Sequence, residues 1–195
     1  EYIGKHSILE RADRSTIINN RVVVNHAKYI TDINYGYLLG NPVQYQASEG
    51  YDIQPILEEY KKQTIATLDS EIAKSLSIFG TQYEYIYADE EANPRSCKVD
   101  NRSCIVVYDD TVAHNKLFGL MYRPIYNGQR FAYWDITYAD DHEIRHYQSK
   151  SKSVLRETSE SLTHSFGGVP FIQFKNNEEM MGDFEPVITI IDAYN

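Results

Sequence analysis

The five residues His142 to His146 (HEIRH) match the H-E-x-x-H pattern of zinc-dependent proteases. In those enzymes the pattern lies on a helix, which places both histidines on one face as zinc ligands and leaves the glutamate to act as general base. Glu157, Glu160 or His164 could supply a third ligand. This chemistry would make the chain a zinc-dependent hydrolase.

The residues around this pattern favour a strand over a helix, because a predicted strand and an acidic turn precede it. Side chains alternate between the two faces of a strand, so His142 and His146 would share one face while Glu143 points to the other. The longer metalloprotease pattern also fails, since Ser149 stands where Gly belongs and Lys152 where the third His belongs. We therefore prefer a strand that carries His and Tyr side chains to a zinc site.

Other groups that could carry chemistry lie in weaker patterns. Paired carboxylates can hold Mg²⁺, but these pairs fall at expected strand ends and turns, where Asp is favoured for backbone reasons. They are Asp109-Asp110, Asp140-Asp141, Glu178-Glu179 and Asp183-x-Glu185. The sequence around Gly167-Gly168 matches no phosphate-binding loop, and Cys97 and Cys104 match no nucleophile pattern. We expect no catalytic residue, no cofactor and no metal.

The composition disfavours three classes of protein: nucleic-acid-binding modules, disulfide scaffolds and membrane-spanning proteins. The formal net charge of −9, from 19 Lys and Arg against 28 Asp and Glu, disfavours a free-standing nucleic-acid-binding module. Two cysteines without CxxC spacing disfavour a disulfide scaffold and favour a reducing compartment. The longest apolar run, Cys104 to Tyr108, is far shorter than the ~20 residues that span a membrane. Seventeen tyrosines favour strands with a half-exposed Tyr face, and a protein interface is the alternative reading.

Helical patterns dominate the first part of the chain. Residues 1–24 are charged and read as an N-terminal connecting arm. Asn25 is a good N-cap for a helix that Gly40 and Pro42 end. A second apolar stripe steps by three or four residues from Asp52 to Gly80 and predicts one continuous helix, long enough to make the domain elongated.

From residue 82 the apolar period changes to two, which predicts an antiparallel sheet. We expect a polar loop at Asp89–Arg102 and a mobile loop or long turn at Ser149–Ser153, and Asn127-Gly128 is a strong hairpin signal. Pro124 confines its strand to an edge or a bulge. The predicted strands are Tyr83–Tyr87, Cys104–Tyr108, Phe118–Tyr126, Arg130–Tyr138, Glu143–Gln148 and Pro170–Phe174. Residues 186–195 begin a helix, with Val187, Ile190, Ile191 and Tyr194 on its apolar face, that continues past Asn195.

The predicted fold class is therefore α+β: long helices packed with a Tyr-rich antiparallel meander. Residues 25–195 form one domain, helical over 25–80 and a sheet over 82–175.

Several strings in this order resemble the portal proteins of tailed bacteriophages, in the branch typified by Bacillus siphophages. The resemblance covers nearly the whole chain and rests on the strings together, since each alone is weak. They are GYLLGNP at 36–42, SLSIFG at 75–80, VYDDT at 107–111, HSFGGVP at 164–170, FKNN at 174–177, GDFE at 182–185 and IDAYN at 191–195.

The resemblance implies a structural protein and not an enzyme. Portal subunits form a ring of about twelve copies at one capsid vertex, through which double-stranded DNA is packaged and ejected without sequence-specific binding. It implies a terminase, capsid or scaffolding protein and head-completion proteins as partners, and no membrane. It places the protein in the virion at the portal vertex, and in the bacterial host cytoplasm during assembly. This chain would form an elongated wing-like domain.

The resemblance brings no catalytic residue to this chain. It implies structural roles at a helix end, a strand entry and a turn before the last helix. These positions are Gly36, Gly40, Pro42, Gly80, Gly167, Pro170, Asn176, Asn177, Gly182 and Asp183.

Overall fold

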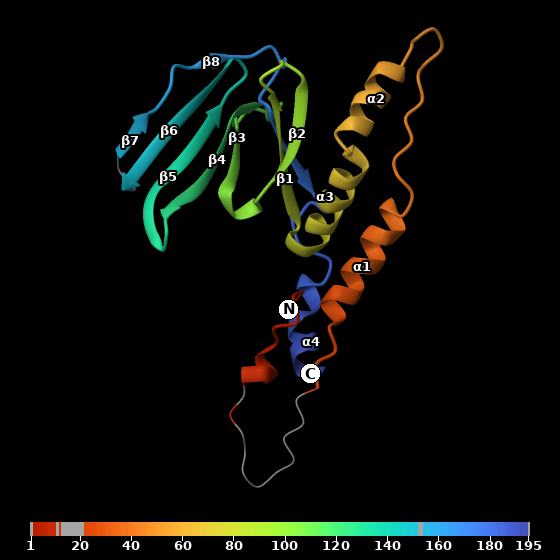
Figure 1. Ribbon diagram of the computed structural model, residues 1–195. Helices are drawn as coiled ribbons and strands as arrows, with labels where there is room; N and C mark the ends of the chain where they lie inside the picture. The colour runs from red at the N-terminus through yellow and green to blue at the C-terminus, as the bar shows by residue number, and fades with distance from the viewer. Residues whose placement is uncertain (1, 11, 13–21, 152–153, 195) are drawn as a thin grey trace. The chain divides into compact units, whose positions relative to one another are not determined.

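The computed structural model describes residues 2–10, 12, 22–151 and 154–194 (Figure 1). The chain forms two compact units. The helical unit comprises Glu1–Thr81 and Lys175–Asn195, and the sheet unit comprises Gln82–Phe174. The sheet unit is therefore an insertion within the chain of the helical unit. Helices and antiparallel sheets together confirm the predicted α+β class.

The first helix, α1 (His26–Leu39), begins as its sequence predicts. The Asn25 side chain accepts a hydrogen bond of 2.9 Å from the backbone N–H of Lys28, which satisfies one of the unpaired donors at the helix start. The helix does not end with the usual left-handed glycine. Gly40 keeps a right-handed conformation with φ −59°, so the helix stops ahead of Pro42 without a left-handed glycine.

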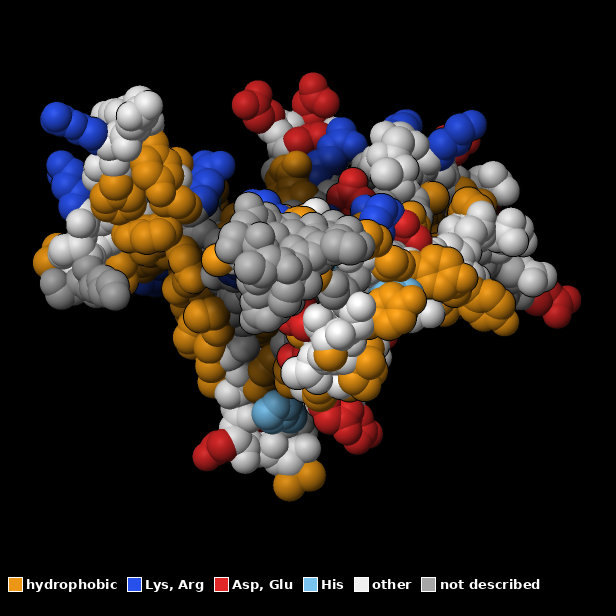
Figure 2. Space-filling view, turned by 90° about the horizontal axis from the view of Figure 1, so that it is seen from below, with side chains coloured by type: hydrophobic (Ala, Val, Ile, Leu, Met, Phe, Trp, Pro, Cys, Tyr) orange, Lys and Arg blue, Asp and Glu red, His pale blue; other side chains and the backbone are white. Residues whose placement is uncertain are grey.

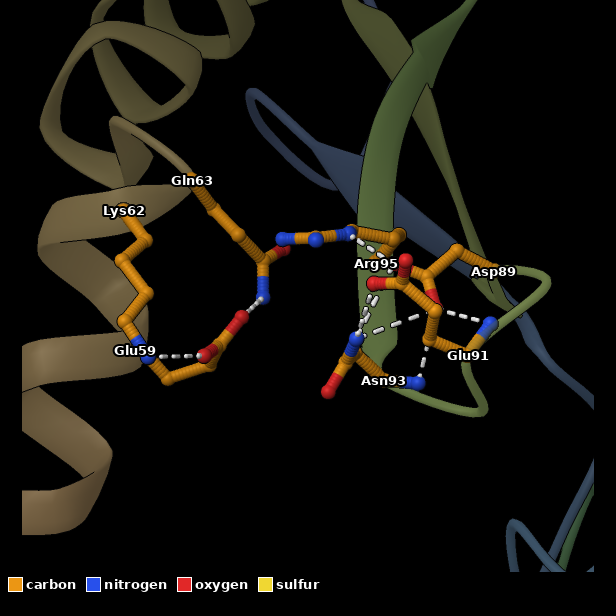
Figure 3. Close-up of polar contacts among 7 residues, drawn as sticks. All are labelled: Glu59, Lys62, Gln63, Asp89, Glu91, Asn93 and Arg95. Carbon is orange, nitrogen blue, oxygen red and sulfur yellow. Dashed lines mark hydrogen bonds and ion pairs between the residues drawn. The ribbon is translucent and has the colours of Figure 1, made fainter.

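The single helix predicted from Asp52 to Gly80 is wrong, because the chain breaks it into α2 (Gln54–Lys62) and α3 (Ile65–Phe79). Thr64 lies between them in the left-handed region with φ 53°. Glu59 accepts side-chain hydrogen bonds from Gln63 at 3.0 Å and Lys62 at 3.4 Å, which closes the end of α2 (Figure 3). The cause is visible in the stripe itself, which has no matching apolar residue between Tyr60 and Ile65.

The core of the helical unit forms where α1, α3 and the last helix meet. Ala27, Phe184 and Ile191 are buried there, with Tyr2 packed against them. His6, just before η1 (Ser7–Glu10), is only 3% exposed, so part of the predicted arm is packed, whereas Ile3 and Val22 are 73% and 68% exposed. Most of residues 11–21 lie outside the described residues.

The last helix begins as a 3-10 turn, η3 (Glu185–Val187), and continues as α4 (Ile188–Tyr194). Its predicted apolar face is only half correct. Val187 and Ile191 face the core, whereas Ile190 and Tyr194 are 65% and 71% exposed. The His26 and Tyr194 rings meet edge to face with centroids 5.2 Å apart, so Tyr194 contacts the start of α1. Asn195 lies outside the described residues.

The sheet unit holds a three-stranded sheet in the order β2-β1-β9, made from β2 (Pro94–Val99), β1 (Thr81–Ala88) and β9 (Phe171–Lys175). The loop predicted at Asp89–Arg102 is wrong, because β2 pairs antiparallel with β1. Asp89 makes this pairing possible. Its carboxylate accepts hydrogen bonds from the Asn93 N–H at 2.8 Å and from Arg95 Nε at 2.8 Å, which closes the turn (Figure 3).

The second sheet is the predicted antiparallel meander, in the order β3-β4-β5-β6-β7, with β8 paired to β6 (Figure 1). The Asn127-Gly128 hairpin is confirmed, and Pro124 lies beyond the stretch paired with β3, next to a register shift at Ile125/Tyr126. Its strands are β3 (Cys104–Tyr108), β4 (Lys116–Asn127), β5 (Arg130–Ala139), β6 (Glu143–Ser151), β7 (Val154–Glu157) and β8 (Leu162–Thr163). A short 3-10 turn, η2 (Asn101–Ser103), precedes β3.

The loop predicted at Ser149–Ser153 starts too early, because β6 continues to Ser151 and turns into β7. Ser149 is buried, and its hydroxyl donates a hydrogen bond of 2.6 Å to the Val154 carbonyl. Residues 152 and 153 lie outside the described residues.

The core of the sheet unit lies between its two sheets and includes Tyr85, Cys104 and Phe171. Tyr83 and Tyr87 pack against it and stay partly buried, which agrees with the half-exposed tyrosines that the sequence predicts on strands. Phe171 is fully buried and its ring lies directly against Gly119, where a Cβ atom would overlap it. Among the described residues, no helix is both long and apolar enough to cross a membrane.

Candidate functional site

The HEIRH segment forms a bend and a strand, as its sequence context predicts. His142 lies in the bend before β6 and its side chain is 85% exposed, while Glu143 begins the strand. Glu143 forms an ion pair with Arg145, and the hydrogen bond from Arg145 holds the pKa of Glu143 below its ordinary value. A carboxylate stabilised in its charged form by a neighbouring guanidinium is a poor general base.

The other parts of the suggested zinc site are used elsewhere. A hydrogen-bond contact of 3.3 Å joins His146 Nδ1 to the Thr137 hydroxyl on the next strand, and another of 3.0 Å joins His164 Nε2 to the Asp140 carbonyl. In the chain outside residues 1, 11, 13–21, 152–153 and 195, no three His, Cys, Asp or Glu side chains gather as a metal site would require. The geometry gives the zinc-hydrolase alternative no support.

Two of the acidic pairs stabilise turns, as predicted. The Asp109 carboxylate accepts hydrogen bonds from the Thr111 hydroxyl at 2.8 Å and from the Asn115 side chain at 2.9 Å. The Asp140 carboxylate accepts hydrogen bonds from the backbone N–H groups of His142 and Glu143, at 2.9 and 2.8 Å. These contacts are what short loops require, so the carboxylates act on the backbone.

The predicted structural positions after β9 form a polar cluster in the helical unit. The Asn176 backbone N–H donates a hydrogen bond of 2.8 Å to the Gly80 carbonyl at the end of α3. Its side chain donates to the Met181 carbonyl at 3.0 Å and to Asp183 Oδ1 at 2.7 Å. Asn177 adds reciprocal contacts of 2.8 Å with the Met181 backbone. The loop is thus held closed by two adjacent asparagines.

Asp183 is the centre of this cluster and is half-buried. Its second carboxylate oxygen accepts a hydrogen bond of 2.7 Å from Asn34 on α1, and its backbone N–H donates one of 2.8 Å to the Ser77 carbonyl on α3. Burial opposes the charge, but hydrogen bonds from Ser77, Asn176 and Asn34 hold the pKa of Asp183 below its ordinary value. Asp183 therefore does more than the solvated turn residue that its sequence predicts.

Two glycines of the cluster are required by close backbone approach. Gly80 has φ +75°, and a Cβ atom there would overlap the Met180 carbonyl. At Gly182 a Cβ atom would lie 2.6 Å from the Ile78 carbonyl oxygen, which is closer than real contacts allow. The loop after β9 therefore packs backbone to backbone on the end of α3. This arrangement positions the helices.

A comparison with known protein families gives a match over the whole chain. The family model described as "Phage portal protein, SPP1 Gp6-like" matches residues 1–195. The chain belongs to this phage portal protein family. The portal protein of Bacillus phage SPP1 is 25% identical over 202 residues, which cover 92% of this chain and 38% of that protein. The portal-family chain therefore spans well under half the length of this relative.

The ten predicted positions of this portal-family chain do not form one site. Gly80, Asn176, Asn177, Gly182 and Asp183 meet in the cluster described above. Gly36, Gly40 and Pro42 lie in or just after α1, and a Cβ atom at Gly36 would meet nothing within 4 Å. Gly167 and Pro170 belong to the sheet unit, where Gly167 has φ +74° and the Pro170 carbonyl accepts a hydrogen bond of 2.9 Å from Ile86 N–H.

Sequence reasoning missed the helical partners of the portal-family cluster. Asn34, Ser77 and Thr31 complete it, with the hydroxyl groups of Ser77 and buried Thr31 3.2 Å apart. Thr31 and Asn34 are three positions apart on α1 and therefore share a face, which was the available signal. No pattern in a single sequence pairs Asn34 with Asp183, which lies 149 positions later.

Proposed function

We propose that this chain is part of a structural subunit of a phage portal ring at the capsid vertex. The observation that carries the proposal is the family match over all 195 residues. The subunit would form the conduit for DNA packaging and ejection. Because the chain spans 38% of its SPP1 relative, the activity of the whole protein is inferred from the family and from the fold together.

The proposed role of this region is a wing-like domain without catalytic activity. Supporting it is the polar cluster at Asp183, in which every described contact fixes helices and a loop. The HEIRH strand supports it too, because Glu143 is held in an ion pair with Arg145. The same proposal keeps the predicted boundaries, with residues 1–24 as the connecting arm and 25–195 as the wing.

The proposal includes the partners that a portal ring needs. These are about eleven further copies of the subunit, the terminase, capsid or scaffolding protein and head-completion proteins. Double-stranded DNA would pass through without sequence-specific binding. The net charge of −9 suits a conduit, because a surface rich in fixed cations would retain DNA phosphates. The protein would be located in the virion and, during assembly, in the bacterial host cytoplasm.

Negative-stain microscopy of the full-length gene product, with light scattering on the same sample, tests the proposal. We expect rings with a central hole and a total mass about twelve times that of the full-length subunit. In the full-length protein, Gly80→Ala should destabilise the helical unit and lower the assembled fraction relative to the wild type. A wild-type protein that remains a folded monomer or dimer would contradict the proposed function.

A further inference from the structure

A ladder of aromatic rings runs along the β4–β5 hairpin to its tip. Tyr122 and Trp134 meet edge to face with centroids 5.6 Å apart, Trp134 and Phe131 lie 5.4 Å apart, and Phe131 and Tyr126 6.1 Å apart. Exposure increases toward the tip, where Phe131 is 42% and Tyr126 57% exposed. Aromatic side chains in this setting are typical of protein interfaces.

A positive charge lies beside this ladder at the turn. Arg130, which pairs with Asn127 at the end of the hairpin, has an exposed side chain. Arg123, further along β4, is neutralised by Asp135 at 2.8 Å. In Figure 2 the left-hand part of the surface shows a hydrophobic patch flanked by Lys and Arg side chains. We call Tyr126, Arg130, Phe131 and Trp134 the tip surface.

The opposite end of the same sheet is acidic. Asp109 and Asp110 lie in the turn between β3 and β4, and Asp140 and Asp141 lie between β5 and β6. Asp109 and Asp140 are engaged within their turns, whereas Asp110 and Asp141 are exposed. Two basic side chains lie nearby. Lys116 Nζ donates a hydrogen bond of 3.0 Å to the Phe171 carbonyl, so it is engaged within its own chain. His142 lies 3.6 Å from the Asp141 carboxylate. We call these four aspartates the acidic end.

Antiparallel topology keeps the two surfaces apart within one chain. Strand β5, with ten residues from Arg130 to Ala139, joins the tip surface to the acidic end. At the usual rise per residue its ends are roughly 33 Å apart, so neither surface can reach the other in the same molecule. Two complementary patches at opposite ends of one rigid sheet suit a head-to-tail contact between copies, and such contacts close into rings when the rotation allows.

We propose that the tip surface of one copy docks on the acidic end of the sheet in the next copy. Arg130 faces Asp110 and Asp141 in this contact, while Phe131 and Tyr126 are covered. The proposal rests on the proposed portal function and names the surfaces that join its neighbouring subunits. A nucleic-acid ligand is disfavoured, because the tip surface has one cation, Arg130, on a chain of net charge −9, and one cation is too few for a phosphate backbone.

A charge swap in the full-length gene product tests this contact. One variant carries Arg130→Glu and the other carries Asp110→Lys with Asp141→Lys. Each alone places like charges opposite each other, so we expect the assembled fraction, measured by light scattering, to fall at least about tenfold. Mixing the two variants restores opposite charges at every contact and should restore assembly. Lys61→Glu on α2, an equal charge reversal in the helical unit, is the matched control and should assemble normally.

Each outcome decides between the inferences. If both variants assemble as well as the wild type, or if the mixture of non-assembling variants does not recover, the tip surface does not dock on the acidic end and this inference is wrong. The proposed portal function would then stand, because the wild type still forms rings. A wild-type protein that forms no rings contradicts both. Circular dichroism of each variant confirms that a lost assembly is not a lost fold.

Discussion

Asn34 on α1 donates a hydrogen bond of 2.7 Å to the carboxylate of Asp183, a residue 149 positions later in the chain. The contact joins the first helix to the loop that follows the inserted sheet unit. Asp183 also bonds α3 through its backbone N–H, so one residue connects both helices to the C-terminal segment. The helical unit therefore depends on a side chain that the sequence marks only as part of a turn.

Acid should weaken the helical unit through Asp183. Because its pKa is lowered in the folded protein, its charge adds stability above its ordinary pKa of about 4, and this contribution is lost as the pH falls through the lower native value. Asp183→Asn should flatten the fall in unfolding free energy below about pH 4 and cost about 1–3 kcal/mol at pH 7. Urea unfolding at several pH values measures both effects. Glu178→Gln, at an exposed position in the same loop, is the matched charge-removing control for stability at pH 7.

Two glycine-to-alanine substitutions should change the unfolding free energy in opposite directions. Gly80→Ala introduces a Cβ atom at positive φ and against the Met180 carbonyl, and should lower the unfolding free energy by more than about 1 kcal/mol. Gly36→Ala fills open space within α1, and should raise it by about 0.5–1 kcal/mol because alanine favours the helix. Thermal unfolding of the two variants compares them directly. Equal destabilisation by both would contradict the packing at Gly80.

Phe171 and Gly119 should show strong coupling in a double-mutant cycle. Phe171→Ala empties the centre of the sheet core and should cost about 3–5 kcal/mol. Gly119→Ala pushes a methyl group against the Phe171 ring and should cost about 1–3 kcal/mol alone. In the Phe171→Ala background the ring is gone, so Gly119→Ala should be nearly neutral. Additive effects in denaturant unfolding would show that the two residues are not in contact.

Alkaline pH should destabilise the sheet unit. Burial raises the pKa of Cys104 to about 12 and that of Tyr85 to about 12. The unfolded chain loses these protons first, from about pH 8.5 for Cys and 10 for Tyr, so the unfolding free energy falls as pH rises through that window. Cys104→Ala should reduce this slope in unfolding curves recorded between about pH 8 and 11.

Thiol labelling provides an independent check on the same residue. Cys104 is 4% exposed, while Cys97 is partly exposed. A thiol reagent at pH 8 should modify Cys104 only after unfolding, because the thiolate is the reactive form and is suppressed by burial. Cys97→Ala provides the control in which Cys104 is the only thiol. Rapid labelling of that variant in the native state would place Cys104 outside the core.

Local patterns in the sequence predicted local structure well. The Asn25 cap, the Asn127-Gly128 hairpin and the strand that carries His146 all follow from neighbouring residues, and the structure has them. The break at Thr64 was missed because the apolar stripe was followed across the four polar residues between Tyr60 and Ile65. A left-handed residue there restarts the helix in a new phase.

The missed strand β2 and the Asp183 cluster have a different cause. Residues 94–99 are polar enough to read as loop, and they become a strand because β1 offers a pairing edge and Asp89 closes the turn. Asn34 and Asp183 meet although the whole sheet unit lies between them in the sequence. Contacts between residues far apart in the chain produce no periodic pattern in a single sequence, so they could not be predicted from it.

The insertion of the sheet unit within the helical unit imposes an order on synthesis. Residues 82–174 are contiguous and mostly pair with sequence neighbours, so this unit can fold as soon as it leaves the ribosome. The helical unit must wait, because Asn176, Asp183 and Phe184 are translated long after the helices α1 and α3 that they contact. Until then the nascent chain displays the unfilled surfaces of α1 and α3, the stage at which premature association between neighbouring chains would be most damaging.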